Sequence, residues 1–371
     1  MGDEAWLRLA FVGLPAGRCQ AVLARWQTPD ALLAAVRGGH EAELLATPGL
    51  TPIMVERLQE AAVRDLFPAL AAMSEHGIRL LLQSEPDYPD ALRGLPDPPP
   101  YLFVRGTVEA RDAVAVAIVG TRHATEYGRG VAAKLAGDLA RRGVTVVSGL
   151  ARGIDTAAHR GALDAGGRTF AVCGCGLDIV YPSDNKKLMQ EVTENGAALS
   201  EFAPTMHPES WHFPARNRII SGLSAGVIIV EAAERSGALI TADFALEQGR
   251  DVFAVPGNIY KAQSRGAHAL IKQGATLVES VDDVITALNN RALPFVREEK
   301  APAAKAAPAV RADLSVTENR VFLVLEVEPR HVDEVAAAAN MGAAEVNATL
   351  VLLELKGVAR RLPGGMFARV D

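Results

Sequence analysis

Between residues 111 and 290 the chain alternates short apolar runs with segments of helical pattern. The apolar runs contain no charged residue and lie at 113–119, 144–147, 169–172, 227–230 and 252–255. Strands of this kind are typical of a parallel sheet that is covered on both faces. The helical patterns between them lie at 130–142, 155–165, 185–195 and 238–248. This alternation predicts an α/β domain with an extended Rossmann-like, doubly wound sheet.

The sequence before this region has a helical pattern. Residues 1–83 predict an all-α N-terminal domain of the helix–hairpin–helix or SAM-like type, followed by the Rossmann domain at 84–292. Within it, the stretch 45–58 predicts two helices around a Pro-Gly turn, the second capped by Thr51 with Pro52 at its first position. Such a stretch resembles motifs of small DNA-backbone binders. Acidic residues offset the nearby arginines, however, which favours a plain helical hairpin.

The sequence after the Rossmann domain predicts a linker and a further small domain. Residues 293–312 are rich in Ala, Pro, Lys and Glu, which is typical of a flexible linker. Three helical segments and a hairpin follow within 313–371 and predict a winged-helix-like domain. Its third helix carries almost no positive charge, and Arg360 and Arg361 are the only basic pair of the wing. We therefore favour contact with a protein, or a regulatory role, over readout of duplex DNA.

The composition limits the kinds of partner that the chain can have. A net charge of −6 and a pI of about 5.8 argue against a broad basic surface that coats duplex DNA, but permit a focused basic groove. Cys173 and Cys175 are poorly spaced for a disulfide and lack further zinc ligands, so we expect core thiols and neither metal nor cofactor. No apolar run reaches about 18 residues. We expect a cytoplasmic protein without a membrane anchor.

The loops at the predicted strand ends are polar and rich in glycine. Residues 213–220 (FPARNRII) place Phe213, Arg216 and Arg218 close together in one of them. A ring on which a base stacks, beside cations for phosphate oxygens, is typical of a single-stranded nucleic-acid site. The carboxyl ends of parallel strands meet at one edge of a sheet. We therefore expect further cations to converge there, namely Arg122, Arg152 and the pair Lys186–Lys187.

Other readings of these residues stay open. Phe-x-x-Arg-x-Arg also occurs as a core aromatic beside two surface arginines. The dinucleotide fingerprint and the Walker lysine motif are absent. His159 and His212 have no partners at metal-ligand spacing, so we interpret them as packing or hydrogen-bonding residues. Acid–base chemistry at Glu201, Glu231 or Glu234 is less favoured than structural pairing.

With these segments assembled, the sequence resembles the DNA-processing protein A family (DprA, also called Smf) of bacterial transformation and recombination. The resemblance is dense between residues 84 and 290. It is carried by residues 88–89 (YP), 97–100 (DPPP), 116–122 (VAIVGTR), 148–159 (SGLARGIDTAAH), 181–182 (YP), 213–220 (FPARNRII), 236–242 (SGALITA) and 249–257 (GRDVFAVPG).

The resemblance implies a non-enzymatic mediator of natural transformation and competence. Such a protein binds single-stranded DNA without sequence preference, protects the incoming strand and loads the RecA recombinase onto it. The DNA-binding residues implied here are Gly120, Thr121, Arg122, Ser148, Gly149, Arg152, Lys186, Phe213, Arg216, Asn217 and Arg218. In this set the arginines and Lys186 hold phosphates, the glycine-rich segments add backbone donors, and Phe213 stacks a base.

The resemblance also implies a homodimer, with His268, Ile271 and Leu277 as candidate contacts, and a recombinase surface near Asp243 and Leu246. The alternative is a Rossmann hydrolase that binds a nucleoside monophosphate, similar to phosphoribohydrolases. Such enzymes need a Pro-Gly-Gly-x-Gly-Thr loop. The only Pro-Gly-Gly of this chain lies at 363–365, in the terminal hairpin.

Overall fold

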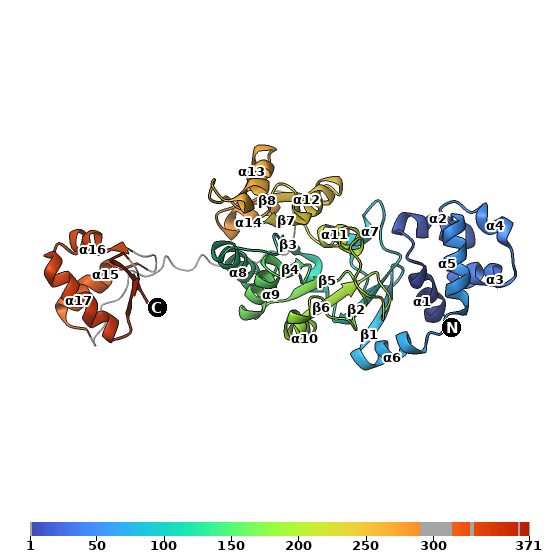
Figure 1. Cartoon of the computed structure of the whole chain (residues 1–371), viewed down its shortest axis with the longest axis horizontal. Helices are drawn as coiled ribbons and strands as arrows, with labels where there is room; N and C mark the ends of the chain where they lie inside the picture. Colours follow the sequence, from blue (N-terminus) through green and yellow to red (C-terminus); the bar gives the residue numbers. More distant parts are fainter. Residues whose placement is uncertain (1, 290–313, 327–329, 363, 371) are drawn as a thin grey trace. The chain divides into compact units, whose positions relative to one another are not determined.

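The computed structural model describes most of the chain in two compact units, Met1–Arg297 and Glu298–Asp371. The described residues are 2–289, 314–326, 330–362 and 364–370. Figure 1 colours the first unit from blue to orange and the second red. The linker predicted at 293–312 lies outside the described residues.

The first unit begins with six helices, which are α1 (Gly2–Val12), α2 (Ala16–Trp26), α3 (Pro29–Arg37), α4 (Glu41–Leu45), α5 (Pro52–Val63) and α6 (Phe67–His76). The predicted helical hairpin is present, since α4 ends at Leu45 and α5 begins with Pro52 at its first position. Thr51 is the N-cap residue of α5, as predicted, and has an extended conformation, but its side chain makes no capping hydrogen bond.

A nine-stranded sheet follows, in the order β1-β2-β6-β5-β4-β3-β7-β8-β9. The strands are β1 (Ile78–Leu82), β2 (Tyr101–Gly106), β3 (Ala115–Val119), β4 (Thr145–Ser148), β5 (Thr169–Val172), β6 (Gly196–Ser200), β7 (Gly226–Ile229), β8 (Asp251–Ala254) and β9 (Thr276–Leu277). Strands β3 to β9 are parallel, whereas β1 and β2 form an antiparallel edge. The predicted doubly wound α/β fold is confirmed.

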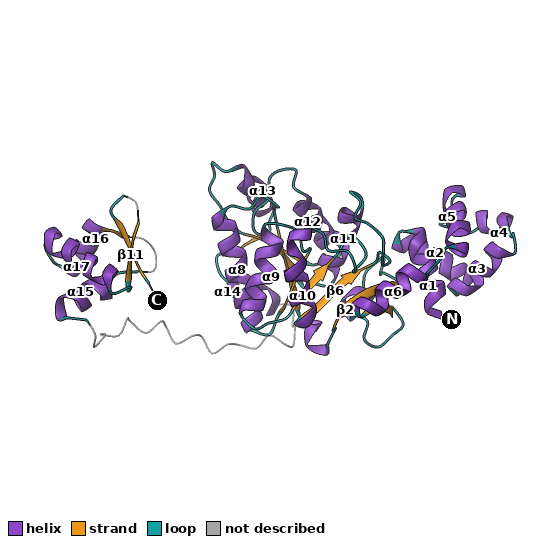
Figure 2. Ribbon diagram, turned by 60° about the horizontal axis from the view of Figure 1, so that its bottom comes forward, coloured by secondary structure: helices purple, strands orange, loops and turns teal. Residues whose placement is uncertain are grey.

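Helices cover both faces of this sheet (Figure 2). They are α7 (Asp90–Arg93), α8 (Glu126–Arg141), α9 (Ile154–Asp164), α10 (Lys186–Glu194), α11 (His212–Gly222), α12 (Gly237–Glu247), α13 (Arg265–Lys272) and α14 (Val281–Asn289), with short 3-10 segments η1 (Ala110–Ala113), η2 (Ser183–Asn185) and η3 (Ala262–Ser264). Strand β3 shows the two-sided burial. Ala115, Ala117 and Val119 join one core cluster, while Val116 and Ile118 join the other.

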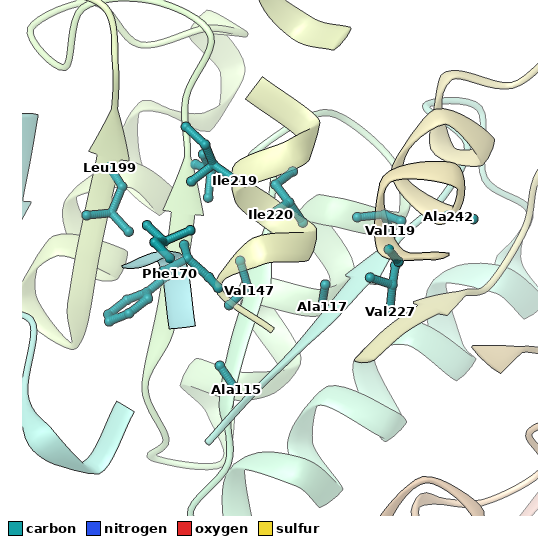
Figure 3. Packing of buried hydrophobic residues seen from close by; sticks show 14 of the residues in the cluster. Ala115, Ala117, Val119, Val147, Phe170, Leu199, Ile219, Ile220, Val227 and Ala242 are labelled. Atoms are coloured by element: carbon teal, nitrogen blue, oxygen red, sulfur yellow. The ribbon is translucent and has the colours of Figure 1, made fainter. Parts of the chain in front are cut away.

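The face that carries the candidate site is packed by α11 and α12. Figure 3 shows Ile219 and Ile220 of α11 and Ala242 of α12 above side chains of the strands. All three are almost completely buried. This packing fixes α11 against the carboxyl ends of the central strands, which decides where its polar residues lie.

The structure differs from the prediction in several elements. Residues 213–218 were expected in a loop and instead belong to α11. Strands β1, β6 and β9 were not predicted. Because β1 (Ile78–Leu82) pairs with β2, the sheet begins before the expected domain boundary at residue 84.

The N-terminal helices pack directly on the antiparallel edge of the sheet. The rings of Trp6 and Tyr101 lie 5.7 Å apart, and Leu7 shares a core cluster with Phe103. Gln20 donates a hydrogen bond of 2.9 Å to the carbonyl of Pro98. Pro98 lies in a proline-rich segment at 95–100 (LPDPPP), which we call the proline-rich connector. Apolar packing and a long-range hydrogen bond thus join the helical region to the Rossmann domain.

The second unit has the predicted winged-helix arrangement. Its elements are α15 (Val316–Val324), β10 (Arg330–His331), α16 (Val332–Ala339), α17 (Ala343–Leu355), β11 (Ala359–Leu362) and β12 (Met366–Arg369), with the sheet order β10-β12-β11. Helix α17 contains neither lysine nor arginine. Within the described ranges no individual helix could cross a membrane. Helices α16 and α17 satisfy the length and composition test only as a pair bent by 106°.

Candidate nucleic-acid interface

Helix α11 presents one polar face to a cavity at the carboxyl edge of the sheet. Phe213, Arg216, Asn217 and Ile220 recur at helical spacing, and all four line this cavity of about 520 Å³. Residues from the loops after β3, β4 and β5 and from the start of α12 complete its wall. We call it the edge cavity, lined by Val119, Gly120, Thr121, Arg122, His123, Ala151, Asp155, Tyr181, Ser210, Phe213, Pro214, Arg216, Asn217, Ile220, Ser236, Gly237, Ala238, Ile240 and Thr241.

Arg216 is a buried cation at this cavity. Its side chain is held by hydrogen bonds from Nη1 to the carbonyls of Gly149 (2.8 Å) and Val172, and the residue is only 5% exposed. No carboxylate of the described residues lies within ion-pair distance of it, and its Nε has no acceptor. Burial lowers the pKa of Arg216, against the opposing effect of Asp155. An uncompensated buried charge beside a cavity favours an anionic ligand.

Asp155, at the start of α9, organises the loop after β4. Its Oδ2 accepts hydrogen bonds from the amides of Gly149 (3.1 Å) and Ala151 (3.3 Å). Burial raises the pKa of Asp155 to about 6, while Arg216 acts in the opposite direction. This carboxyl is too far from Arg216 for an ion pair and neutralises it only partly.

The predicted backbone donors are mostly engaged within the protein. The amide of Thr121 donates to the carbonyl of Glu231 (2.7 Å), and that of Gly149 donates to Asp155. Ser148 is fully buried, with its hydroxyl on the carbonyl of Ile118. Gly120 and Thr121 do line the edge cavity. The structure therefore places these segments at the site, but it offers the amides of Thr121 and Gly149 to no ligand.

Phe213 is half-buried and forms part of an aromatic wall. Its ring centroid lies 5.4 Å from that of Tyr181, which is 44% exposed, and 5.2 Å from the guanidinium of Arg122. Arg122 is exposed, and no described carboxylate pairs with it. The ring of Phe213 is therefore neither buried in the core nor fully exposed. It stands between a second ring and a cation at the mouth of the cavity.

Three predicted cations lie outside the lining of the edge cavity. Arg152 lines a small side pocket next to the edge cavity and forms an ion pair of 2.7 Å with Asp184. Lys186 is exposed at the start of α10, outside both cavities. The Nζ of Lys187 lies 3.7 Å from the Oε1 of Glu191. None of the three lines the edge cavity, and only Arg152 lines the side pocket.

Arg218 does not join the site. Two residues along a helix differ by about 200° around its axis, so Arg218 lies on the side of α11 opposite Arg216. There it pairs with the carboxylate of Glu201 and donates to the carbonyl of Asp97 (2.9 Å). The residue is 8% exposed. Its expected phosphate contact has no support in this geometry, and its partners fasten the proline-rich connector to α11.

Several site residues were not predicted from the sequence. Tyr181, Asp155 and the segment Ser236–Gly237 all line the edge cavity, although no role was assigned to them. All of them lie in segments that carry the family resemblance. Their position directly after strands or at helix starts was the signal that could have identified them.

The histidines and glutamates have the structural roles that we expected. His159 and His212 are fully buried and hydrogen-bond to Thr169 and to the carbonyl of Gly174. Glu231 accepts from the amide and hydroxyl of Thr125 and so holds the start of α8. In the described part of the chain, no group of His, Cys, Asp and Glu could hold a metal ion.

The residues expected at protein contacts lie on three elements, α12, α13 and β9. Leu277 is 42% exposed on β9, the edge strand of the sheet. His268 instead contacts the backbone of Gly257, and Ile271 packs partly against the core. Asp243 and Leu246 are exposed on one face of α12.

The chain matches two family models. Residues 79–289 match DNA recombination-mediator protein A, and residues 303–365 match the DprA winged helix domain. Protein Smf of Escherichia coli is 37% identical over 363 residues, covering 98% of this chain and 94% of that protein. DNA processing protein DprA of Bacillus subtilis is 40% identical over 260 residues, covering 68% of this chain and 88% of that protein.

Solved structures agree with these matches. DNA processing protein A from Streptococcus pneumoniae superposes with a TM-score of 0.63 at 37% identity, covering 75% of this chain and 95% of that one. The Helicobacter pylori protein, whose structure describes a single-stranded DNA binding mode, gives a TM-score of 0.53 at 33% identity, covering 59% of this chain and 98% of that one. The chain therefore belongs to the DNA recombination-mediator protein A family.

Proposed function

We propose that this chain binds single-stranded DNA across the edge cavity and acts as a recombination mediator rather than as an enzyme. The observation that carries the proposal is Arg216, a buried guanidinium without an ion-pair partner among the described residues, at the floor of a cavity whose mouth holds Phe213 and Arg122. The ligand of such a site must bring negative charge and a flat apolar surface. A single strand, with phosphates and unpaired bases, brings both.

The arrangement also supports binding without sequence preference. Each base has a face that stacks on a ring, whereas discrimination needs hydrogen bonds to base edges. Phe213 and Tyr181 offer faces, and the cations Arg122 and Arg216 suit phosphate oxygens. The Helicobacter pylori relative described for its single-stranded DNA binding mode supports the same ligand class.

We further propose that the protein works as a homodimer in the cytoplasm, protects the strand and loads the RecA recombinase onto it. The family membership and the exposed edge strand β9 with Leu277 support self-association. Asp243 and Leu246 share an exposed face of α12 and are our candidates for the recombinase contact. Since α17 has no basic residue, we assign the winged unit to protein contact or regulation.

The proposed site is tested by a salt-dependent titration of Arg122→Ala with single-stranded and double-stranded oligonucleotides. We expect weaker binding to all single strands alike, because Arg122 contacts backbone and not base edges. The slope of log affinity against log salt should fall by about 0.7 for each phosphate that the variant no longer neutralises. Arg111→Ala is the matched control, since Arg111 is exposed before β3, at the opposite edge of the sheet. Equal affinities of wild type, Arg122→Ala and Arg111→Ala would refute the site.

In the same titration Phe213→Ala tests the stacking wall. Loss of a base stack costs about 1–3 kcal/mol of binding free energy. The salt slope should stay at its wild-type value, since the substitution removes no cation. A variant that binds like the wild type would return Phe213 to a packing role beside Tyr181.

A further inference from the structure

The amino end of α12 forms part of the wall of the edge cavity. Ser236, Gly237, Ala238 and Thr241 all line it, together with Arg216 from α11. Helix α12 has 11 residues, so its first turn presents unpaired amides and the positive end of a helix dipole. Sites of this kind attract phosphate groups.

The hydrogen bonds at this helix start leave one donor unused. The hydroxyl of Ser236 accepts from the amide of Ala238 (3.3 Å), and Asn217 donates to the carbonyl of Gly237 (3.3 Å). None of the hydrogen bonds between described residues uses the amide of Gly237. Asn217 thereby fixes the start of α12 against α11, with the Gly237 amide exposed.

Arg216 provides the independent observation. This side chain is more than nine-tenths buried, lines the same cavity as Gly237, and has an Nε without an acceptor. Its positive charge has no described carboxylate within ion-pair distance. The start of α12 and the buried guanidinium of Arg216 thus line one cavity, and Asp155, the carboxylate in its lining, is too far from Arg216 for an ion pair.

We propose that the start of α12 and Arg216 form a phosphate seat, which takes the phosphate of the nucleotide whose base lies against Phe213. The seat rests on the proposed binding of single strands and adds the element that fixes one phosphate. The shared chemistry is a phosphate next to a base. A free nucleoside 5′-monophosphate therefore also fits, as a weaker ligand that lacks the neighbouring contacts.

Gly237 allows a substitution that fills the seat without disturbing the fold. A Cβ built at Gly237 meets no atom within 4 Å. An aspartate in the first turn of a helix is also favourable for the helix itself. Gly237→Asp therefore places a carboxylate where the phosphate would lie. Gly130→Asp is the matched control, because a Cβ at Gly130 is equally free and Gly130 lies on α8 outside the edge cavity.

The first measurement is the affinity of the full chain for a labelled oligothymidylate by fluorescence anisotropy. We expect Gly237→Asp to bind about tenfold more weakly, with a salt slope lower by about 0.7, and Gly130→Asp to bind like the wild type. Unchanged melting temperatures show that both variants fold. Equal affinity and slope for Gly237→Asp and the wild type would overturn the seat while leaving Arg122 and Phe213 as the proposed site.

The second measurement uses thymidine 5′-monophosphate and thymidine as competitors. The monophosphate should displace the oligonucleotide from the wild type, thymidine should do so far less, and Gly237→Asp should remove this difference. Equal competition by both compounds would overturn the seat. A wild type that fails to bind the strand would refute the proposed function instead. The seat would then be tested by melting temperatures. The monophosphate should raise the melting temperature of the wild type but not that of Gly237→Asp, and thymidine should raise neither.

Discussion

Arg122 and Arg216 both bring a guanidinium group to the edge cavity, but that of Arg122 is exposed and that of Arg216 is buried. Arg122 is exposed and lies against the face of Phe213, so its charge is well hydrated before a ligand arrives. Arg216 is buried and is held by the carbonyls of Gly149 and Val172. Its hydration is already lost on folding, so a phosphate that reaches it gains attraction without a further desolvation cost at the arginine.

The sequence pointed to Phe213, Arg122 and Arg216, which the structure brings together at the edge cavity, because a ring beside guanidinium groups is typical of single-strand sites. It was insufficient for Asp155, which has the appearance of an ordinary helix-start carboxylate. Its importance comes from burial and from its distance to Arg216, and both depend on tertiary packing.

Acidification should strengthen binding through Asp155. Burial raises the pKa of its carboxyl from 3.8 to about 6, so the folded chain takes up a proton there as the pH falls through about 6. The neutral carboxyl no longer offsets Arg216. We expect the affinity for single strands to rise roughly fivefold between about pH 7.5 and 5.5, the effect of about 1 kcal/mol from one nearby charge. Affinity measured across this range at constant ionic strength checks it.

The raised pKa of Asp155 also determines how the stability of the fold changes with pH. Because the folded pKa exceeds the ordinary value, the stability contributed by this group is full below pH 3.8 and is lost as the pH rises through about 6. His123 also lines the edge cavity, so the affinities at different pH values are compared in a His123→Gln background. If Asp155→Asn in that background keeps the full pH dependence, Asp155 is not its source.

At the scale of elements, α11 decides which polar residues serve the site. Residues 213–218 of this helix were expected in one of the polar loops at the strand ends. Proline is tolerated in the first turn of a helix, which is where Pro214 lies. Once the segment is helical, Arg216 and Arg218 must lie on different sides, and the phosphate contact expected of Arg218 loses its basis.

We expect Arg218→Ala to destabilise the fold and to leave the salt slope of DNA binding unchanged. The change leaves Glu201 mostly buried without its partner, which costs about 3 kcal/mol of unfolding free energy. Chemical denaturation measures this loss. The double variant Arg218→Met with Glu201→Gln should recover most of it. A lower salt slope in Arg218→Ala would restore this arginine to the DNA site.

The strands were predicted well where they are buried on both faces. Runs such as those of β3 and β5 contain no charge, and their positions differed from the structure by two residues or fewer. Strand β6 consists mainly of small residues, and β9 has two residues, so neither produces a recognisable pattern. Their pairing with neighbouring strands, rather than their own sequence, makes them strands.

At the scale of the whole molecule, an acidic chain brings two arginines without a described ion-pair partner, Arg122 and Arg216, to one cavity at the carboxyl edge of the sheet. The net charge of −6 disfavours general adhesion to nucleic acid, whereas the edge cavity offers Arg122 and Arg216 to a strand that can enter it. A folded duplex has its bases stacked inside and cannot reach the ring of Phe213. We therefore expect the composition to contribute to selectivity for single strands.

The homodimer that we propose would lengthen the stretch of single strand bound, and the edge strand β9 is our candidate for its contact. We expect Leu277→Arg to shift the dimer towards monomer, because a charge at an exposed edge strand opposes strand-to-strand contact. Sedimentation velocity measures this shift. Binding to long strands should weaken more than binding to short ones, since two linked sites raise the effective concentration of the strand.

Ile53→Arg is the control for this experiment. Ile53 is 65% exposed on α5, among the helices that pack at the β1 side of the sheet, whereas β9 forms the other edge. The control should sediment like the wild type. If Leu277→Arg also does so, the dimer contact lies elsewhere.

The contact between Arg122 and Phe213 has a consequence for the way a strand enters. In the unliganded chain the guanidinium stands 5.2 Å from the ring centroid and covers one of its faces. A ring face accommodates one partner at a time, so a base that stacks on this face must displace the arginine. The displaced guanidinium of Arg122 can then bind the neighbouring phosphate of the strand. We therefore expect a base to replace the Arg122 guanidinium on the ring of Phe213 when a strand binds, and the same guanidinium then to bind the backbone.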